Sequence, residues 1–279
     1  MSTPKSIDDI LKDVEQLPAM PKAVTEIIRC LDDDSVEIET LVKQISSDIG
    51  LATRILRLAN TPHFSVHGNI ATVHDAVMLV GFKEIRDMVC VVGVKESLPQ
   101  SKSVAFDYAQ FWRHSLGVAV CARILANLVR LSPDTAFISG MLHDIGQLAL
   151  ILSAPDEFRL AVDYRVSHGC QIFEAEQAVL GMDHAKAGAH LFKKWDFPQV
   201  ICDAIEKHHM PDTDHTFLMA DLIHVSEVLC HALEIGNEEH AIPPLSDQAM
   251  LRLGINFNRL KPYFAQIECE YQSAILMLD

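Results

Sequence analysis

The sequence predicts an all-α protein, and two observations support that prediction. Apolar residues recur at helical spacing through most of the 279 residues, whereas no alternating strand pattern persists. Proline, glycine and capping residues divide the chain into segments of helix length. Residues 89–94 could pass for a strand on their own, but they lie within a longer helical pattern. We therefore expect a bundle of many helices.

The first part of the chain has clear signals for helix ends. Ser6, Asp48 and Thr72 precede apolar stripes as N-cap residues, and Pro21 suits the first turn of a helix. Gly81 is expected to close the helix that begins at Thr72. The helices expected here span residues 6–16, 22–31, 38–45, 48–59, 72–80 and 82–98, with a loop at 62–71.

A short polar stretch at residues 99–103 is the expected boundary, and a long helix at 107–130 follows it. Ser132, Pro133 and Asp134 then combine a hydroxyl cap, a proline in the first turn and an acid near the positive helix end. Further helices are expected at 156–168, 171–180, 184–195, 198–209, 216–235, 246–253 and 259–277. We expect an N-terminal helical subdomain at 1–98, a helical core at 104–235 and C-terminal helices at 236–279.

Composition indicates an ordinary globular protein of the cytoplasm. The formal charge of −15 argues against a nucleic-acid partner, and the acidic residues are spread as on a solvated surface. Seven cysteines without a CxxC pair are expected to be reduced thiols. No continuous apolar run approaches the roughly 18 residues of a membrane span, and residues 1–30 lack a signal-peptide core. We therefore expect no membrane association.

The stretch most suggestive of chemistry is the adjacent pair His143-Asp144. An imidazole and a carboxylate are ligands for a borderline divalent ion such as zinc, iron or manganese. Apolar residues lie on both sides of the pair, so it is expected in or beside a core, where an unpaired carboxylate is costly. The helix that begins at Ser132 is expected to carry this pair. A metal site needs three or four donors, so other residues must contribute.

Several other polar residues lie among apolar neighbours on expected helices. These are His114, His184, His208, His209 and Asp221. Taken singly, each such residue is more often a hydrogen-bonded core residue than a ligand. His224 and His231 share a helix face, and packing explains them equally well. The histidines in loop-like surroundings, which we interpret as surface residues, are His63, His67, His168, His215 and His240.

The order of these residues changes the interpretation. A histidine, a His-Asp pair, a histidine, paired histidines and an aspartate follow one another, which resembles the HD superfamily of metal-dependent phosphohydrolases. The series is similar to that of the HD-GYP phosphodiesterases, where it holds a two-metal site. The resemblance implies one or two ions of iron, manganese or zinc. The ligands that it implies are His114, His143, Asp144, His184, His208, His209 and Asp221.

Motifs in the N-terminal part of the chain point to one particular family within this superfamily. These motifs resemble those of HDOD domains, regulatory relatives of the HD hydrolases in bacterial signalling proteins. The resemblance extends over roughly residues 10–230 and implies a signalling protein that meets a protein partner and binds metal, with a nucleotide or phosphate as a further ligand. The matching stretches are 17–21 (LPAMP), 45–48 (ISSD), 58–61 (LANT) and 76–82 (AVMLVGF).

Three departures from the HD-GYP pattern bear on activity. Gln147 stands where those enzymes usually have a lysine, so a cationic phosphate partner is missing. The Gly-Tyr-Pro signature is absent, since Met210 and Pro211 follow the paired histidines. Gln110 stands where a glutamate ligand of a third metal can occur. HDOD domains commonly lose the metal ligands as well, whereas this chain retains the series.

Three functions therefore remain open, and the catalytic residues stay unassigned. The first is a regulatory protein that binds metal without fast turnover. The second is an active metal-dependent phosphodiesterase or phosphatase, acting on a phosphate ester or cyclic dinucleotide. The third is a purely structural hydrogen-bonded network. Nucleotide-binding loops and serine-hydrolase motifs are absent from the sequence, and Cys202 beside His208 is better explained by packing than by thiol catalysis.

Overall fold

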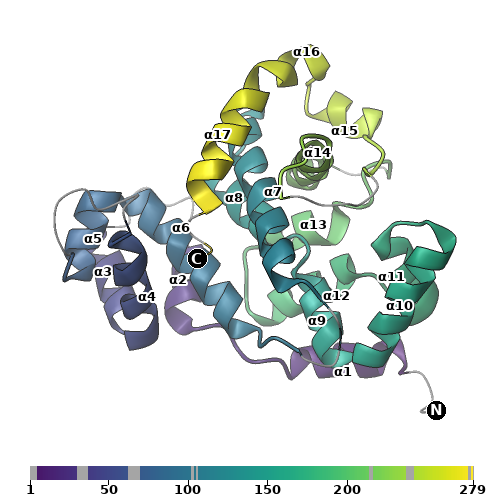
Figure 1. Ribbon diagram of the computed structural model, residues 1–279, viewed down its shortest axis with the longest axis horizontal. Helices are drawn as coiled ribbons and strands as arrows, with labels where there is room; N and C mark the ends of the chain where they lie inside the picture. Colours follow the sequence, from purple (N-terminus) through teal and green to yellow (C-terminus); the bar gives the residue numbers. More distant parts are fainter. Residues whose placement is uncertain are drawn as a thin grey trace. The chain divides into compact units, whose positions relative to one another are not determined.

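The computed structural model confirms the all-α prediction (Figure 1). It describes residues 5–29, 37–61, 70–101, 104, 106–213, 216–236, 242–275 and 278. Every regular element within these ranges is a helix, including residues 89–94, whose strand alternative is wrong. The expected loop at 62–71 lies largely outside the described ranges, as do His63, His67, His215 and His240.

The chain forms two compact units. One comprises Met1–Leu17 and Gln100–Ala274, and the other Pro18–Pro99 and Ile275–Asp279. The division after residue 99 falls where the polar stretch begins. The first helix, however, clusters with the larger unit rather than with the helices that follow it in sequence.

The smaller unit is built around its last helix. Helix α6 packs against the four helices that precede it within this unit, and Gly93 lies directly against Val24. Two expected caps are confirmed, since Asp48 accepts from the backbone N–H of Leu51 at 3.0 Å and Thr72 accepts from that of Asp75 at 3.0 Å. The helices are α2 (Lys22–Arg29), α3 (Ile38–Ser46), α4 (Ile49–Ala59), α5 (Val73–Val80) and α6 (Phe82–Ser97).

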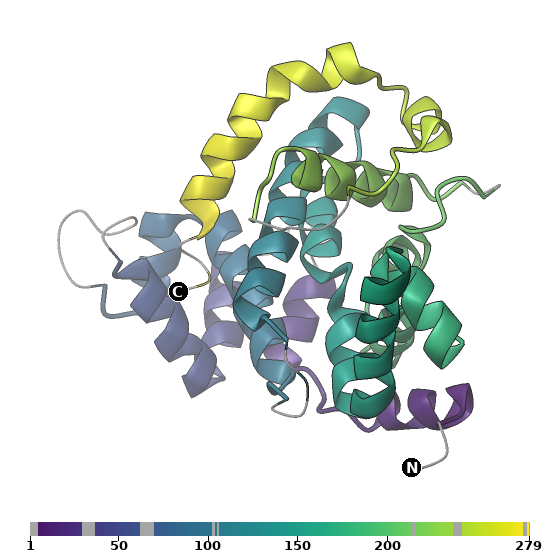
Figure 2. The same ribbon diagram turned by 45° about the vertical axis from the view of Figure 1, so that its right-hand side comes forward.

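The larger unit is organised around the long helix α7, Tyr108–Val129. Helices α8, α14 and α17 pack against α7, as Figures 1 and 2 both show. The capped start of α8 is confirmed, because Ser132 accepts from the backbone N–H of Thr135 at 3.2 Å. The helices of this unit besides α7 are α1 (Ile7–Glu15), α8 (Pro133–Leu142), α9 (Ile145–Ser153), α10 (Pro155–His168), α11 (Ile172–Leu180), α12 (His184–Lys194), α13 (Gln199–Lys207), α14 (Leu218–Ala232), α15 (Asp247–Arg252), α16 (Phe257–Leu260) and α17 (Phe264–Ala274).

Two expected helices are divided in the structure. The helix predicted to carry His143-Asp144 ends at Leu142 and a new helix begins at Ile145, so the pair occupies the junction. The segment Pro133–Ser153 is long and apolar enough to cross a membrane, but 94% of its most apolar window is buried inside the structure, as in a core helix. The helix predicted at 259–277 is interrupted by a 3-10 turn that contains Pro262, which lacks the N–H of a continuous helix.

Helix α9 approaches α12 so closely that only glycine fits at the contact. A Cβ on Gly146 would overlap the carbonyl oxygen of His184 and come within 2.7 Å of the backbone nitrogen of Gly188. Backbone atoms cannot swing aside as a flexible side chain would. This contact brings the start of α12 against the junction that carries the His-Asp pair.

We therefore predict that Gly146→Ala lowers the free energy of unfolding by about 3 kcal/mol or more, because the methyl group overpacks a backbone contact. Urea denaturation followed by circular dichroism measures this change. The control is Gly169→Ala, where φ is +64° but a Cβ would meet nothing within 4 Å. It should cost only about 1 kcal/mol, the strain of a left-handed alanine. Equal losses in the two variants would contradict the proposed contact.

Candidate metal centre

The junction between α8 and α9 turns the His-Asp pair inward. His143 is fully buried, and its Nδ1 donates to the carbonyl oxygen of Gly140 at 2.8 Å. Asp144 leaves the helical conformation, with φ −99° and ψ 4°. The side-chain amide of Gln147 donates through Nε2 to Asp144 Oδ2 at 2.9 Å. One carboxylate oxygen is thus held by Gln147, and the other is directed at the surrounding histidines.

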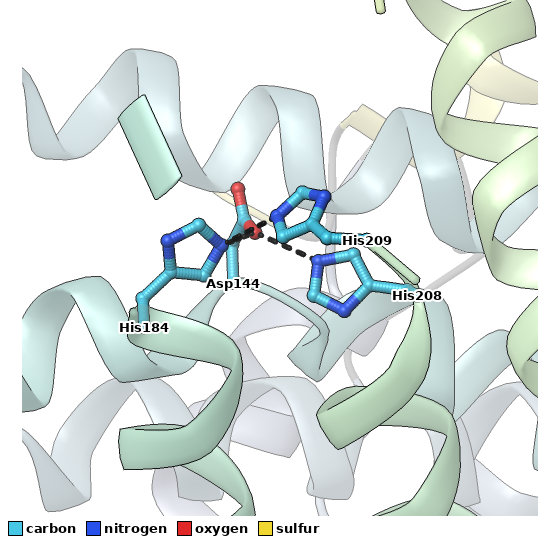
Figure 3. A group of neighbouring side chains, drawn as sticks. All are labelled: Asp144, His184, His208 and His209. Atoms are coloured by element: carbon cyan, nitrogen blue, oxygen red, sulfur yellow. Dashed lines mark hydrogen bonds and ion pairs between the residues drawn. The ribbon is translucent and has the colours of Figure 1, made fainter. Parts of the chain in front are cut away.

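Imidazole nitrogens from three segments converge on that oxygen, and Figure 3 shows the rings of His184 and His208 beside it. Asp144 Oδ1 lies 2.9 Å from His184 Nε2, 3.4 Å from His143 Nε2 and 3.6 Å from His208 Nε2. His209 Nε2 lies 2.9 Å from His184 Nε2. These ring nitrogens are brought together from the first residue of α12 and from the end of α13. The expected ligands His143, Asp144, His184, His208 and His209 therefore share one cluster.

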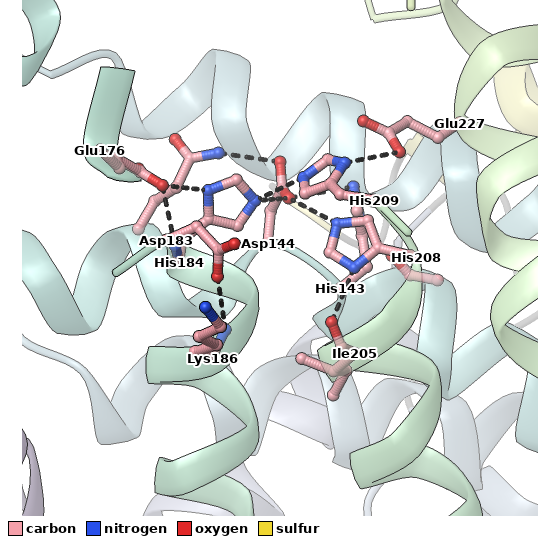
Figure 4. Close-up of polar contacts among 12 residues, drawn as sticks. His143, Asp144, Glu176, Asp183, His184, Lys186, Ile205, His208, His209 and Glu227 are labelled. Carbon is pink, nitrogen blue, oxygen red and sulfur yellow. Dashed lines mark hydrogen bonds and ion pairs between the residues drawn. The ribbon is translucent and has the colours of Figure 1, made fainter. Parts of the chain in front are cut away.

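His184 is held from its backbone and from its ring. Asp183 caps α12 by accepting from the backbone N–H of Lys186 at 2.9 Å, which places His184 at the first helical position. The buried carboxylate of Glu176 accepts from the backbone N–H of His184 at 2.8 Å and lies 2.6 Å from its Nδ1 (Figure 4). A carboxylate on the outer nitrogen of a histidine fixes the ring and raises its basicity as a ligand.

The rings of two further histidines are fixed in the same sense. His208 Nδ1 lies 2.7 Å from the carbonyl oxygen of Ile205, as His143 Nδ1 lies against a carbonyl oxygen one turn earlier. A carbonyl oxygen can only accept, so the Nδ1 atom of each ring carries the proton. The Nε2 atom of a neutral ring then presents a lone pair, as in a metal-binding histidine.

Burial and the neighbouring charges set the protonation of the cluster. Burial lowers the pKa of His143 to about 4, so this ring is neutral near pH 7. Burial likewise lowers the pKa of His209 well below its usual value. Burial acts against a charge on His184, but Glu176 and Asp144 outweigh it and raise the pKa of His184. Burial acts against the Asp144 carboxylate too, and the histidines overcome it and hold its pKa low.

The donor set fits a divalent metal ion. The oxygen of Asp144 and the Nε2 lone pairs of His143 and His208 repel one another at these distances, and a cation between them would remove that repulsion. Ligands about 2.1 Å from one ion stand about 3.0–3.4 Å apart, which the observed separations of 2.9–3.6 Å bracket. Nitrogen and oxygen donors together favour zinc, iron or manganese over calcium or magnesium.

A second group of donors adjoins the first and shares two of its members. His114, from α7, offers a ring nitrogen within 4.8 Å of ligand atoms of His143 and Asp144. Glu227 and His231, one helical turn apart on α14, lie within the same distance of His114. The imidazoles of His114 and His143 have ring centroids 5.2 Å apart. The cluster therefore contains more donors than one ion requires.

Asp221 does not take the position expected from the sequence. It is fully buried, and both of its carboxylate oxygens accept from the guanidinium of Arg252, each at 2.7 Å. It belongs to none of the donor groups found in the described part of the chain. Glu227, six residues further along α14, faces the histidines instead, because six residues rotate a helix by about 240°.

Three residues of the cluster were missed by sequence reasoning. Glu176, Glu227 and His231 now lie against the expected ligands. Glu227 had one signal in the sequence, since it lies within an otherwise mostly apolar helix, whereas Glu176 lies among other polar residues and had none. That signal marks a buried acid without saying what it faces. Packing explains the shared face of His224 and His231 equally well, so the sequence alone does not assign His231 to the site.

Comparison with known proteins identifies a family whose model matches most of this chain. The family model named HDOD domain matches residues 17–211. An "Uncharacterized protein" of Treponema pallidum (strain Nichols) is 24% identical over 210 residues, 74% of this chain but 40% of that protein. The chain thus spans about two fifths of that relative.

Two solved structures share the fold. The "HDOD domain protein with unknown function" from Geobacter sulfurreducens has a TM-score of 0.76 at 23% identity, over 97% of this chain and 98% of that one. A "Putative phosphohydrolase" from Shewanella amazonensis SB2B has a TM-score of 0.75 at 24% identity, over 97% and 98% of the two chains. At these identities the likeness is one of fold.

The contact between Glu176 and His184 leads to a prediction about metal affinity. Glu176→Gln keeps the size of the side chain but removes the charge behind the His184 ring, which should weaken metal binding by about 10–100-fold. Titration against a chromogenic zinc chelator measures this affinity. Glu174→Gln is the matched control, because this exposed residue lies two positions away on α11 and accepts from the backbone N–H of Gln171 at 2.9 Å. An unchanged affinity in Glu176→Gln would contradict its ligand-supporting role.

Proposed function

The chain belongs to the HDOD domain family, and on that premise we propose that it is a regulatory signalling protein that holds a divalent metal ion. One observation carries the proposal: the Nε2 atoms of His143, His184 and His208 converge on one oxygen of Asp144. A divalent cation among these atoms would balance the carboxylate and the ring lone pairs together. The ion would be iron, manganese or zinc.

The regulatory role is supported by the residues around the cluster. When bound, a divalent ion polarises a phosphoryl group and lowers the pKa of a water molecule. Hydrolysis also benefits from a cationic side chain that binds the phosphate. At the position after His-Asp-Ile-Gly, however, Gln147 is neutral and its amide is directed at Asp144. In this chain that residue orients a ligand and supplies no charge to a substrate.

The second candidate function is a working phosphohydrolase, and the adjoining donor group favours it. Asp144 belongs both to the group with His184, His208 and His209 and to the group with His114 and His143. The residues of the two groups would together hold two ions, which would bind a phosphoryl group and activate water. In this function the chain's own histidines and acids would hold the ions and move protons, with a phosphate ester or cyclic dinucleotide as substrate.

The cellular setting is also part of the proposal. All six cysteines in the described part of the chain are free thiols, which is typical of a reducing compartment such as the cytoplasm. We expect the protein to act there through a protein partner that contacts its helical surface. A nucleotide or phosphate is the small ligand that the metal would attract. The net charge of −15 makes nucleic acid an unfavourable partner.

The third possibility, a purely structural polar network, predicts a different response to metal. In that case the buried polar groups stabilise the fold by hydrogen bonding alone, and adding metal leaves the stability unchanged. A bound ion instead stabilises the folded state in proportion to its affinity, because the site is not formed in the unfolded chain. Stability measured with and without metal therefore separates the two.

We predict that untagged wild-type protein, purified without chelator, retains at least about one equivalent of metal and that His143→Ala, Asp144→Ala loses it. Elemental analysis by mass spectrometry measures the content. His168→Ala, at an exposed histidine of α10, is the control and should keep the metal. Absence of metal from the wild type, even after it is added back, would leave the structural network as the explanation. Steady phosphodiesterase or phosphatase turnover that the double variant abolishes would replace the regulatory role with the enzymatic one.

A further inference from the structure

The segment that follows the paired histidines is attached to helix α15 through Arg252. The Nε and Nη2 atoms of Arg252 donate to the two carboxylate oxygens of Asp221, each at 2.7 Å. The same Nη2 also donates to the carbonyl oxygen of Pro211. One guanidinium thus connects α15, α14 and the backbone three residues beyond His208.

The other end of α15 is attached to the same segment. Ser246 Oγ donates to Asp212 Oδ1 at 2.5 Å and accepts from the backbone N–H of Ala249 at 3.1 Å, as the cap of α15. The backbone N–H of Ser246 donates to Nε2 of His224, a buried residue of α14, at 3.3 Å. Both ends of α15 therefore contact one short segment, at the carbonyl oxygen of Pro211 and at the side chain of Asp212.

We propose that Arg252 is a positioning residue that fixes His208 and His209 for metal binding through the carbonyl group of Pro211. Only Met210 lies between His209 and Pro211, and residues 207–210, which include both histidines, form a turn in which Met210 N–H donates to Lys207 O at 2.8 Å. A shift of Pro211 therefore moves both rings. The inference rests on the proposed metal-binding function.

The energetics favour a positioning role over a purely stabilising one. A buried ion pair is seldom more stable than apolar residues of similar volume, because desolvation offsets the attraction. Its advantage is geometric: a planar guanidinium donates in fixed directions, to both oxygens of Asp221 and to the Pro211 carbonyl. A lysine at position 252 could pair with Asp221, but it lacks the rigid fork that reaches the carbonyl at the same time.

The test separates this role from stability by removing the whole ion pair. Arg252→Met alone leaves the carboxylate of Asp221 buried without its guanidinium and should lower the melting temperature. The double variant Asp221→Leu, Arg252→Met removes both charges and should regain the wild-type melting temperature to within about 3 °C. It still lacks the donor to Pro211, so its dissociation constant for Zn²⁺ should remain about tenfold higher than that of the wild type. Arg252→Lys should show the same loss of affinity.

Two controls complete the experiment. Arg259→Met removes an exposed arginine of α16 that donates to Gly254 O, and it should leave Zn²⁺ affinity unchanged. Amide hydrogen exchange of the metal-free proteins across residues 207–213 gives a readout that needs no metal. We expect faster exchange there in the double variant and in Arg252→Lys, with the rest of the chain unaffected.

The outcomes distinguish the two proposals. Wild-type Zn²⁺ affinity in both Arg252→Lys and the double variant, or unchanged exchange at 207–213, would overturn the positioning role while leaving the metal site intact. If the wild type itself binds no Zn²⁺, the proposed function fails. Unchanged hydrogen exchange at residues 207–213 would then reject the positioning role of Arg252 as well. Faster exchange in the variants would establish that Arg252 orders this segment.

Discussion

The structure depends on the need to neutralise one buried carboxylate oxygen. Asp144 Oδ1 is surrounded by imidazole Nε2 atoms, and the outer nitrogens of those rings already donate to carbonyl oxygens or to Glu176. The Nε2 atoms of His143 and His208 are therefore oriented to present lone pairs, whereas Glu176 and Asp144 raise the pKa of His184. A single divalent cation would balance the negative charge of this oxygen and the neighbouring lone pairs, which apolar side chains would not. Around this constraint the helices of the larger unit are arranged.

Several local features of the larger unit place the Asp144 carboxylate and the histidines around it. The break between α8 and α9 turns Asp144 toward the histidines, and Gly146 permits the start of α12 to approach the break. Gln147 holds the second carboxylate oxygen, and Arg252 holds the segment after the paired histidines. These contacts lie outside the inner ring of donors.

The sequence was sufficient for the fold and for most of the inner donors, for identifiable reasons. Helical periodicity and caps such as Ser132 are local signals, and the adjacent pair at 143–144 needs no knowledge of distant contacts. Asp221 and Glu227 could not be told apart, because both are acids on one helix and only tertiary packing decides which face meets the histidines. Glu176 was missed because its partner His184 belongs to another helix. The break after Leu142 lies between Gly140 and Gly146, and neither glycine stands at the break itself.

The ring tautomers of His143 and His208 test the account most directly. Long-range ¹H–¹⁵N correlation spectra of the metal-free protein near pH 7 report which ring nitrogen carries the proton. We expect protons on Nδ1 in both rings, and a shift of their Nε2 resonances when Zn²⁺ is added, with Nδ1 remaining protonated. Protons on Nε2, or spectra that Zn²⁺ leaves unchanged, would show that these histidines donate within a polar network and would contradict the metal centre.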